Sequence, residues 1–175
     1  MIEISQAKPE DAAGAQQVFY KTWLDTYPNE ECGITAADIE DRFKDRITDE
    51  GIAKMADKIA NPEPNSLFLL AKDGNKIVGV CRALKNEEKN QLTAIYVLPE
   101  YQGRGVGQMF WQKVKKFFDP NKKITVEVAT YNQKGISFYQ QLGFVDTGRR
   151  FSPENTRMKS GSLIPEMEMV TENNC

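Results

Sequence analysis

The sequence predicts a single α+β domain in which helices flank a mostly antiparallel sheet. Its 175 residues have ordinary globular composition, with 40% hydrophobic and 27% charged residues, and this length suits one domain with its own core. Segments with helical spacing and segments with strict alternation are clearly separated along the chain. Three strand-like segments between residues 67 and 98 are joined by short polar turns, which is typical of an antiparallel meander.

The first sixty residues predict one short strand and three helices. Alternation over Ile2–Ile4 indicates the strand, and Pro9–Asp11 follows as a helix entry, because proline and acidic residues favour the first turn. That helix should end before Pro28, since a residue before proline avoids the helical conformation. Thr35 and Thr48 suit the starts of the next two helices. The residues that recur at helical spacing are Ala15, Val18, Phe19, Thr22, Trp23, Ile39, Phe43, Ile47, Ile52, Met55, Ala56 and Ile59.

The rest of the chain predicts six strands and two helices. Turn signals such as Asp73-Gly74-Asn75 separate the strands, and the region Arg149–Ser162 is polar enough to be a loop. The helices are expected at Val106–Phe117 and Gly135–Leu142. The strands are expected at Leu67–Ala71, Ile77–Ala83, Leu92–Leu98, Ile124–Val128, Phe144–Thr147 and Ile164–Val170.

Histidine is absent from the sequence. This excludes serine–histidine and cysteine–histidine catalytic pairs and any histidine-ligated metal, so protons must move through carboxylates, tyrosine, lysine, cysteine or water. Cys32, Cys81 and Cys175 are far apart and form no CxxC pair, and we therefore expect no metal site. Sparse cysteines, the lack of a signal peptide and the lack of an apolar run of about 20 residues predict a cytoplasmic protein that does not enter a membrane.

The net charge of −2 is unevenly distributed, with −7 in residues 1–66 and +5 in residues 67–175. The two regions are either solvated surfaces of opposite sign, or one of them meets a cation and the other an anion. Neither region is basic enough to predict nucleic acid as a partner.

The strongest chemical motif is Gln102–Gly107, with the sequence QGRGVG, which lies where the third meander strand gives way to a helix. Glycine lets the backbone approach a ligand closely, and a helix N-terminus offers amide groups and partial positive charge to a phosphate. Arg104 adds a cation. The motif fits neither a P-loop nor the GxGxxG dinucleotide fingerprint. A tight glycine turn without a ligand is the structural alternative.

A second motif covers Asn132–Phe144, after the next predicted strand. Tyr139 follows Gly135 by four residues, so the two share one face of a helix. Because the chain has no histidine, a tyrosine near a phosphate-binding loop is a credible proton donor. The alternative is that Phe138 and Tyr139 only pack in the core.

In this order and spacing, the two motifs resemble those of the GNAT family of acetyl-CoA-dependent N-acetyltransferases. The family loop reads Q/R-x-x-G-x-G/A, and Gln102–Gly107 matches each fixed position. The downstream pattern of Asn, a small residue, Tyr and Gly-Phe is matched by Asn132, Gly135, Tyr139 and Gly143–Phe144. Gly135 stands where the family usually has alanine.

The resemblance covers residues 1–170 as one domain and leaves 171–175 as a polar tail. It implies the GNAT fold, which is a mixed α/β arrangement around a central, mostly antiparallel sheet of about seven strands flanked by helices. This sheet is splayed open after the strand Leu92–Leu98.

The resemblance also implies roles for individual residues. The pantetheine arm of the co-substrate acetyl-CoA would enter the splayed sheet, and its pyrophosphate would rest on the glycine-rich loop. The amine would attack the thioester directly, and Tyr139 would be the general acid that protonates the departing thiolate. The sequence does not identify the base. The cofactor-binding residues are expected to be Ile95, Tyr96, Val97, Gln102, Gly103, Arg104, Gly105, Val106, Gly107, Gln108, Asn132 and Phe138.

The end of the first helix is expected to bind the acceptor amine. The segment Trp23–Pro28, with the sequence WLDTYP, combines aromatic faces with a carboxylate, and both attract alkylammonium groups. This segment and Glu166–Val170 are similar to the PaiA-type spermidine/spermine acetyltransferases. The alternative is that the tryptophan is core and the acids form a solvated face. The expected substrate-binding residues are Trp23, Asp25, Tyr27, Glu30 and Glu31.

The sequence therefore predicts an N-acetyltransferase that moves the acetyl group of acetyl-CoA to a primary amine, with spermidine or spermine favoured. One alternative is a protein or peptide N-acetyltransferase, which needs an open groove that the segment 30–60 could cover. Another is a non-catalytic acyl-CoA-binding regulatory module on the same fold. GNAT proteins often pair through late strands and loops, so a homodimer is compatible with the family.

Overall fold

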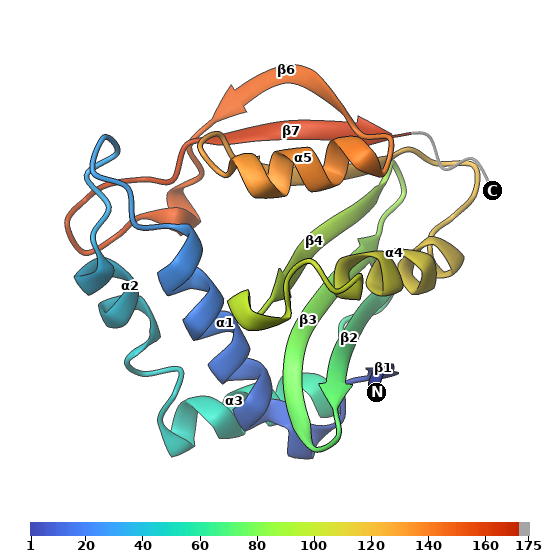
Figure 1. Ribbon diagram of the computed structural model, residues 1–175, viewed down its shortest axis with the longest axis horizontal. Coiled ribbons are helices and arrows are strands. Elements are labelled where there is room, and N and C mark those ends of the chain that lie inside the picture. The colour runs from blue at the N-terminus through green and yellow to red at the C-terminus, as the bar shows by residue number, and fades with distance from the viewer. Residues whose placement is uncertain (172–175) are drawn as a thin grey trace.

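A computed structural model describes residues 1–171, which form a seven-stranded sheet with helices on both faces (Figure 1). The strand order is β1-β2-β3-β4-β5-β7-β6. Only the β4–β5 pair is parallel among the described strands, so the sheet is mixed and mostly antiparallel, as the sequence predicted. The strands are β1 Ile2–Gln6, β2 Ser66–Asp73, β3 Lys76–Lys85, β4 Asn90–Val97, β5 Ile124–Ala129, β6 Val145–Phe151 and β7 Glu166–Thr171. The helices are α1 Ala12–Thr26, α2 Ala36–Phe43, α3 Asp49–Ala60, α4 Val106–Phe117 and α5 Gln133–Gln141.

Side-chain caps set where α2 and α3 begin. The Thr35 hydroxyl accepts a hydrogen bond from the Asp38 amide at 3.2 Å, and the Asp38 carboxylate accepts from the Thr35 amide at 2.9 Å, which is a capping box. The Thr48 hydroxyl accepts from the Gly51 amide at 3.2 Å. The expectation that Ile47 continues the α2 helix is wrong, because the chain turns after Phe43 to reach the Thr48 cap.

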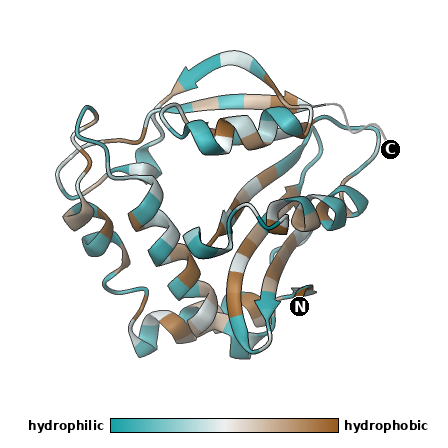
Figure 2. Ribbon diagram, viewed as in Figure 1, coloured by the Kyte–Doolittle hydropathy of each residue, from teal (hydrophilic) through white to brown (hydrophobic). Residues whose placement is uncertain are grey.

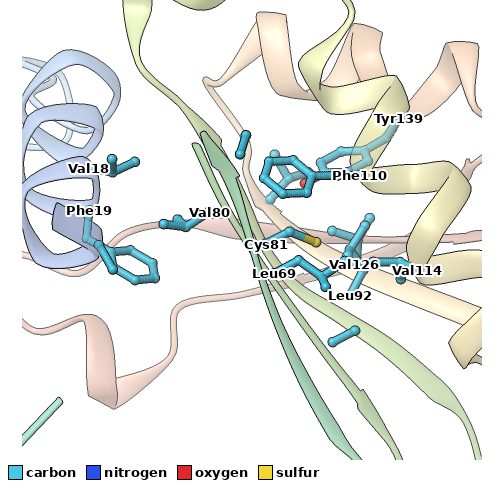
Figure 3. Close-up of a cluster of buried hydrophobic side chains, with 14 of the residues drawn as sticks. Val18, Phe19, Leu69, Val80, Cys81, Leu92, Phe110, Val114, Val126 and Tyr139 are labelled. Carbon is cyan, nitrogen blue, oxygen red and sulfur yellow. The ribbon is translucent and has the colours of Figure 1, made fainter. Parts of the chain in front are cut away.

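The core lies on both faces of the sheet (Figure 3). Val18 and Phe19 of α1 pack on one face, towards Val80, and Phe110 and Val114 of α4 pack on the other. Apolar residues accordingly concentrate on the central strands and on the inward sides of the helices (Figure 2). Helices α1 and α4 both contact β3 and β4, and β4 leads directly into the candidate site.

The sheet opens between β4 and β5. These strands pair over only three positions, Asn90 with Ile124, Gln91 with Thr125 and Leu92 with Val126. The fully buried Asn90 holds the closed end: its amide group donates to the carbonyls of Asp119 at 2.8 Å and Lys122 at 3.0 Å. Beyond Leu92 the two strands separate, as the family resemblance implied.

The C-terminal part differs from the sequence-based expectation in two places. Arg149–Phe151 belong to the edge strand β6 and not to a loop, since they continue its pairing with β7 past a break in register at 146–150. Nearly all of β6 is exposed, so it lacks the apolar alternation that would have revealed it. Thr171 belongs to β7, and residues 172–175 of the expected tail lie outside the described residues. No helix among residues 1–171 is long and apolar enough to cross a membrane.

Candidate active site

A cavity of about 770 Å³ lies where β4 and β5 separate. It is bounded by the end of α1, the open half of β4, the loop before α4, β5 and α5. The structure brings most of the sequence-predicted site residues to this one cavity: Asp25, Tyr27, Ile95, Tyr96, Val97, Gln102, Gly103, Gly105, Val106, Gly107, Gln108, Asn132, Phe138 and Tyr139 line it.

The glycine-rich loop forms a helix N-terminus that is open to the cavity. Gly103 and Gly105 have φ values of 75° and 80°, and Gly105 is the N-cap of α4. Such φ values favour glycine, and a Cβ atom at either position would meet nothing within 4 Å. The Gln102 side chain donates to the Val97 carbonyl at 3.0 Å and ties the loop to the end of β4. The loop therefore has space and amide groups for an anion such as a pyrophosphate.

Gly107 serves close packing between α4 and α5. A Cβ atom at this position would lie 2.8 Å from the Phe138 ring. Arg104 does not line the cavity; it is exposed, and its guanidinium lies 4.9 Å from the centroid of the Tyr101 ring. Arg104 is thus placed as a cation near the rim of the cavity.

Asn132 caps helix α5. Its side-chain oxygen accepts from the Gly135 amide at 3.0 Å, so part of its hydrogen-bonding capacity is used within the protein. A Cβ atom on Gly135 would lie 2.6 Å from the Asn132 amide nitrogen. An alanine at position 135 would therefore require the Asn132 side chain to shift.

Tyr139 projects from α5 into the wall of the cavity and is only 7% exposed. Its ring packs between those of Phe138 and Phe144, at centroid distances of 5.4 and 5.6 Å. Burial, together with the nearby Tyr96, raises the pKa of Tyr139 above its ordinary value. The phenol is therefore protonated at neutral pH, which is the state a proton donor requires.

Three further tyrosines surround the mouth of the cavity near α1. The Tyr27 and Tyr96 hydroxyls share a hydrogen bond of 2.7 Å, and the Tyr131 hydroxyl donates to the Tyr27 carbonyl at 2.8 Å. Tyr131 was not predicted as a site residue from the sequence, although it directly precedes Asn132. Together these tyrosines join α1, β4 and the end of β5 around the cavity.

The predicted acceptor residues fall into two groups. Asp25 and Tyr27 line the cavity, whereas Trp23, Glu30 and Glu31 do not. The Trp23 ring instead packs against Tyr27, with 4.4 Å between centroids, and lies under the Arg42 guanidinium at 5.0 Å. Trp23 thus supports the tyrosine that faces the cavity.

Glu30 and Glu31 are exposed in the turn after α1. Their side chains therefore belong to the outer surface near the acceptor end and not to the cavity wall.

Two carboxylates near the cavity were missed at the sequence level. Glu127 lies on β5 and lines the cavity, and Glu166 is the half-buried first residue of β7. Burial and the nearby Glu127 raise the pKa of Glu166 to about 7. In the sequence, Glu127 is a polar position in the alternating segment Ile124–Val128, and this pattern alone does not mark it as a site residue. Among residues 1–171, no group of histidine, cysteine, aspartate or glutamate side chains could hold a metal ion.

Comparison with known proteins agrees with this geometry. The model of the acetyltransferase (GNAT) domain family matches residues 23–160. The spermidine N(1)-acetyltransferase of Thermoplasma acidophilum is 27% identical over 150 residues, which are 82% of this chain and 88% of that protein. N-acetyltransferase 8F1 of Rattus norvegicus is 27% identical over 92 residues, which are 48% of this chain and 42% of that protein.

A solved structure with the same fold is the PaiA N-acetyltransferase of Thermoplasma acidophilum in complex with coenzyme A. The TM-score is 0.73 at 21% identity, with 98% of this chain and 99% of that chain covered. On the strength of the family match, this chain belongs to the GNAT family and is an acetyl-CoA-dependent N-acetyltransferase.

Proposed function

We propose that the protein acetylates a small polyamine, with spermidine or spermine as the acceptor. The observation that carries this proposal is the single cavity that joins an anion-binding helix N-terminus to an acceptor end containing Asp25, Glu127 and Tyr27. Carboxylates and aromatic faces attract alkylammonium groups. The similarity to a spermidine N(1)-acetyltransferase supports the same acceptor class.

In this proposal, different residues along the cavity bind different parts of acetyl-CoA. Amides of Gln102–Gly107 hold the pyrophosphate of acetyl-CoA, with Arg104 as a nearby cation. The open edge of β4 at Ile95–Val97 bonds the pantetheine arm, which places the thioester close to Tyr139. Asn132, Phe138 and Gln108 complete the wall around the arm.

The proposed reaction is direct transfer. The neutral amine forms a bond to the acetyl carbon while the carbon–sulfur bond breaks, and Tyr139 donates its proton to the departing sulfur. The phenol regains a proton from the new amide nitrogen, so the residue returns to its starting state. Burial of Tyr139 keeps this proton available at neutral pH. Trp23, Glu30 and Glu31 would act only through the shape and charge of the acceptor end.

The sequence-based location and assembly belong to this proposal as well. We place the reaction in the cytoplasm, since sparse cysteines suit a reducing compartment, and Cys32 and Cys81 are free thiols. A homodimer is compatible with the family resemblance, and light scattering of the purified chain tests it.

The test is a panel of acceptors with purified protein and acetyl-CoA, in which released CoA and acetylated products are measured by chromatography and mass spectrometry. We expect turnover with spermidine and spermine to exceed that with amino acids, aminoglycosides and basic peptides. Turnover confined to peptides would support a protein acetyltransferase instead. CoA binding without turnover on any amine would support a regulatory module.

A further inference from the structure

We propose that Glu166 is the general base that removes a proton from the acceptor ammonium before the amine attacks the thioester. This inference rests on the proposed function and identifies the general base that the proposed reaction requires. An alkylammonium group of the lysine type has a pKa near about 10.4, so it arrives protonated at neutral pH and cannot attack. With no histidine in the chain, a carboxylate near the cavity is the natural acceptor for that proton.

The sheet places Glu166 beside Glu127, although Glu166 itself does not line the cavity. In the β5–β7 pair, Glu166 lies opposite Ala129 and Glu127 lies opposite Glu168. Directly opposed residues of an antiparallel pair point to the same face, and side chains alternate along each strand. The three glutamates therefore share one face, and Met167 and Met169 fill the core on the other. Glu127, the diagonal neighbour of Glu166, lines the cavity.

The tyrosine cluster is the second element that faces Glu166. Burial raises the pKa of Tyr27, Tyr96 and Tyr131, and the negative charge of Glu166 raises each of them further. The carboxylate thus lies within electrostatic reach of hydroxyls from α1, β4 and the end of β5. In the Tyr27–Tyr96 pair either oxygen can be the donor, and among residues 1–171 no hydrogen bond links this pair to Glu166.

Glu166 also differs from its neighbours in lacking a cation. Glu168 is paired with Lys89 at 3.6 Å and with Arg149 at 3.2 Å. The other cation of β6, Arg150, is paired with Asp146 at 2.6 Å. Within residues 1–171, Glu166 has neither an ion pair nor a hydrogen bond from its side chain.

The cation of α2 nearest to the cluster is Arg42. It stacks on Trp23 and donates to the Asn155 carbonyl at 2.6 Å. It also interacts electrostatically with Tyr27 and Tyr96, but among residues 1–171 it forms no ion pair with Glu166. Burial next to Glu127, without a compensating cation, leaves Glu166 with a pKa of about 7. This value suits a base that must accept and release a proton near neutral pH.

The ammonium R–NH₃⁺ gives one proton to the Glu166 carboxylate and becomes R–NH₂. The amine then forms the new C–N bond, sulfur leaves with the electron pair of the C–S bond, and Tyr139 supplies the proton of the CoA thiol. The new amide nitrogen loses its second proton to the Tyr139 phenolate. Glu166 finally releases its proton to solvent, so one proton is liberated in each turnover.

The experiment is the pH dependence of kcat/KM for the best amine, measured from pH 5.5 to 10 with wild type, Glu166→Gln, Glu127→Gln and Glu168→Gln. For wild type we expect an acidic limb near pH 7, because Glu166 must be deprotonated to accept the proton of the ammonium. In Glu166→Gln the amine must arrive neutral, so the limb should move to about pH 10, and activity at pH 7 should fall by about 10²–10⁴-fold. Removing the Glu127 charge should move the limb below pH 7.

Glu168→Gln is the matched control, since it changes the same residue type on the same strand and face. Its pH profile should follow that of wild type. CoA affinity and thermal unfolding of all variants report whether the fold is kept. A Glu166→Gln enzyme with wild-type activity and an acidic limb still near pH 7 overturns the inference, as does an unmoved limb in Glu127→Gln. A wild-type protein that acetylates no amine would instead overturn the proposed function itself.

Discussion

The hydroxyls of Tyr27 and Tyr96 lie 2.7 Å apart and connect the end of α1 to the open half of β4. Tyr27 is only 8% exposed, so its hydroxyl depends on this partner. The bond joins the segment predicted to bind the amine to the strand proposed to bind the pantetheine arm. This hydrogen bond therefore links the end of the cavity proposed to bind the amine to the end proposed to bind acetyl-CoA.

Breaking this pair should cost stability in a way that depends on which hydroxyls remain. Tyr96→Phe leaves the buried Tyr27 hydroxyl without its partner, and the free energy of unfolding should fall by about 1–3 kcal/mol. The double variant Tyr27→Phe/Tyr96→Phe should lose less than the sum of the two single changes, because no unpaired hydroxyl remains. Urea unfolding of the four proteins measures this coupling; strictly additive losses would contradict it.

Tyr139→Phe should separate catalysis from binding. Removing the proposed proton donor should lower kcat by about 10²–10⁴-fold, while CoA affinity stays near the wild-type value because the ring still packs between Phe138 and Phe144. Steady-state kinetics and calorimetric titration with CoA make the comparison. Tyr20→Phe is a suitable control, since Tyr20 packs on Phe43 away from the cavity. An unchanged kcat in Tyr139→Phe would remove this residue from the mechanism.

Gly105→Ala should weaken CoA binding through backbone strain. The φ of 80° costs an alanine about 1–2 kcal/mol, and relief of that strain would distort the loop at the start of α4. We expect CoA affinity to fall about tenfold. Gly74→Ala, in the β2–β3 turn with φ of 60° and equally open space, should lose similar stability but bind CoA normally. Equal CoA affinities in the two variants would show that the loop does not bind the cofactor.

Glu166→Gln should stabilise the fold above neutral pH. The pKa of Glu166 is raised from 4.5 to about 7 in the folded state, so the folded protein holds a proton that the unfolded chain has lost. Stability contributed by this group therefore falls as pH rises from about 4.5 to 7. Above pH 7 the glutamine variant should be more stable by about 1–3 kcal/mol, and near pH 4 the difference should vanish. Chemical denaturation at several pH values tests this, and a pH-independent difference would contradict it.

Asp38 should have the opposite pH dependence. Although burial opposes ionisation, hydrogen bonds from Thr35 and Ser160 hold the pKa of Asp38 at about 2, below its ordinary 3.8. Asp38→Ala should lower the free energy of unfolding by about 1–3 kcal/mol at pH 7. This loss should shrink as the pH falls from about 4 to 2, because wild type then loses the same stabilisation. Glu40→Ala, an exposed neighbour, is the control and should have little effect.

Most of the fold followed from local patterns in the sequence. The caps at Thr35 and Thr48, and the short apolar segments and turn signals of the meander, indicate element types through patterns within a few residues. The failures lie where local pattern is weak. Ile47 kept the helical spacing although the chain had already turned, and Arg149–Phe151 belong to an exposed edge strand whose residues have no buried face to mark them.

The candidate site was predictable where it depends on motifs and not where it depends on pairing between strands. The glycine-rich loop and Tyr139 stand out because their spacing is set along the chain. Glu127 and Glu166 become neighbours only through the register of β5 with β7, which no local pattern specifies. Trp23 was predicted to contact the amine, and the structure places it one layer behind Tyr27.

Because β4 and β5 pair over only three positions, we expect ligand binding between them to stabilise the folded sheet. Among residues 1–171, β4 and β5 pair only at Asn90–Leu92. A ligand that binds between the separated parts of these strands binds only the folded protein, so it raises the free energy of unfolding by RT ln(1 + [L]/Kd). A free ligand concentration of about 100 times Kd raises the free energy of unfolding by about 2.7 kcal/mol. The melting temperature should rise with acetyl-CoA concentration, and amide exchange along the open half of β4 should slow. We expect both effects to reverse when CoA is removed.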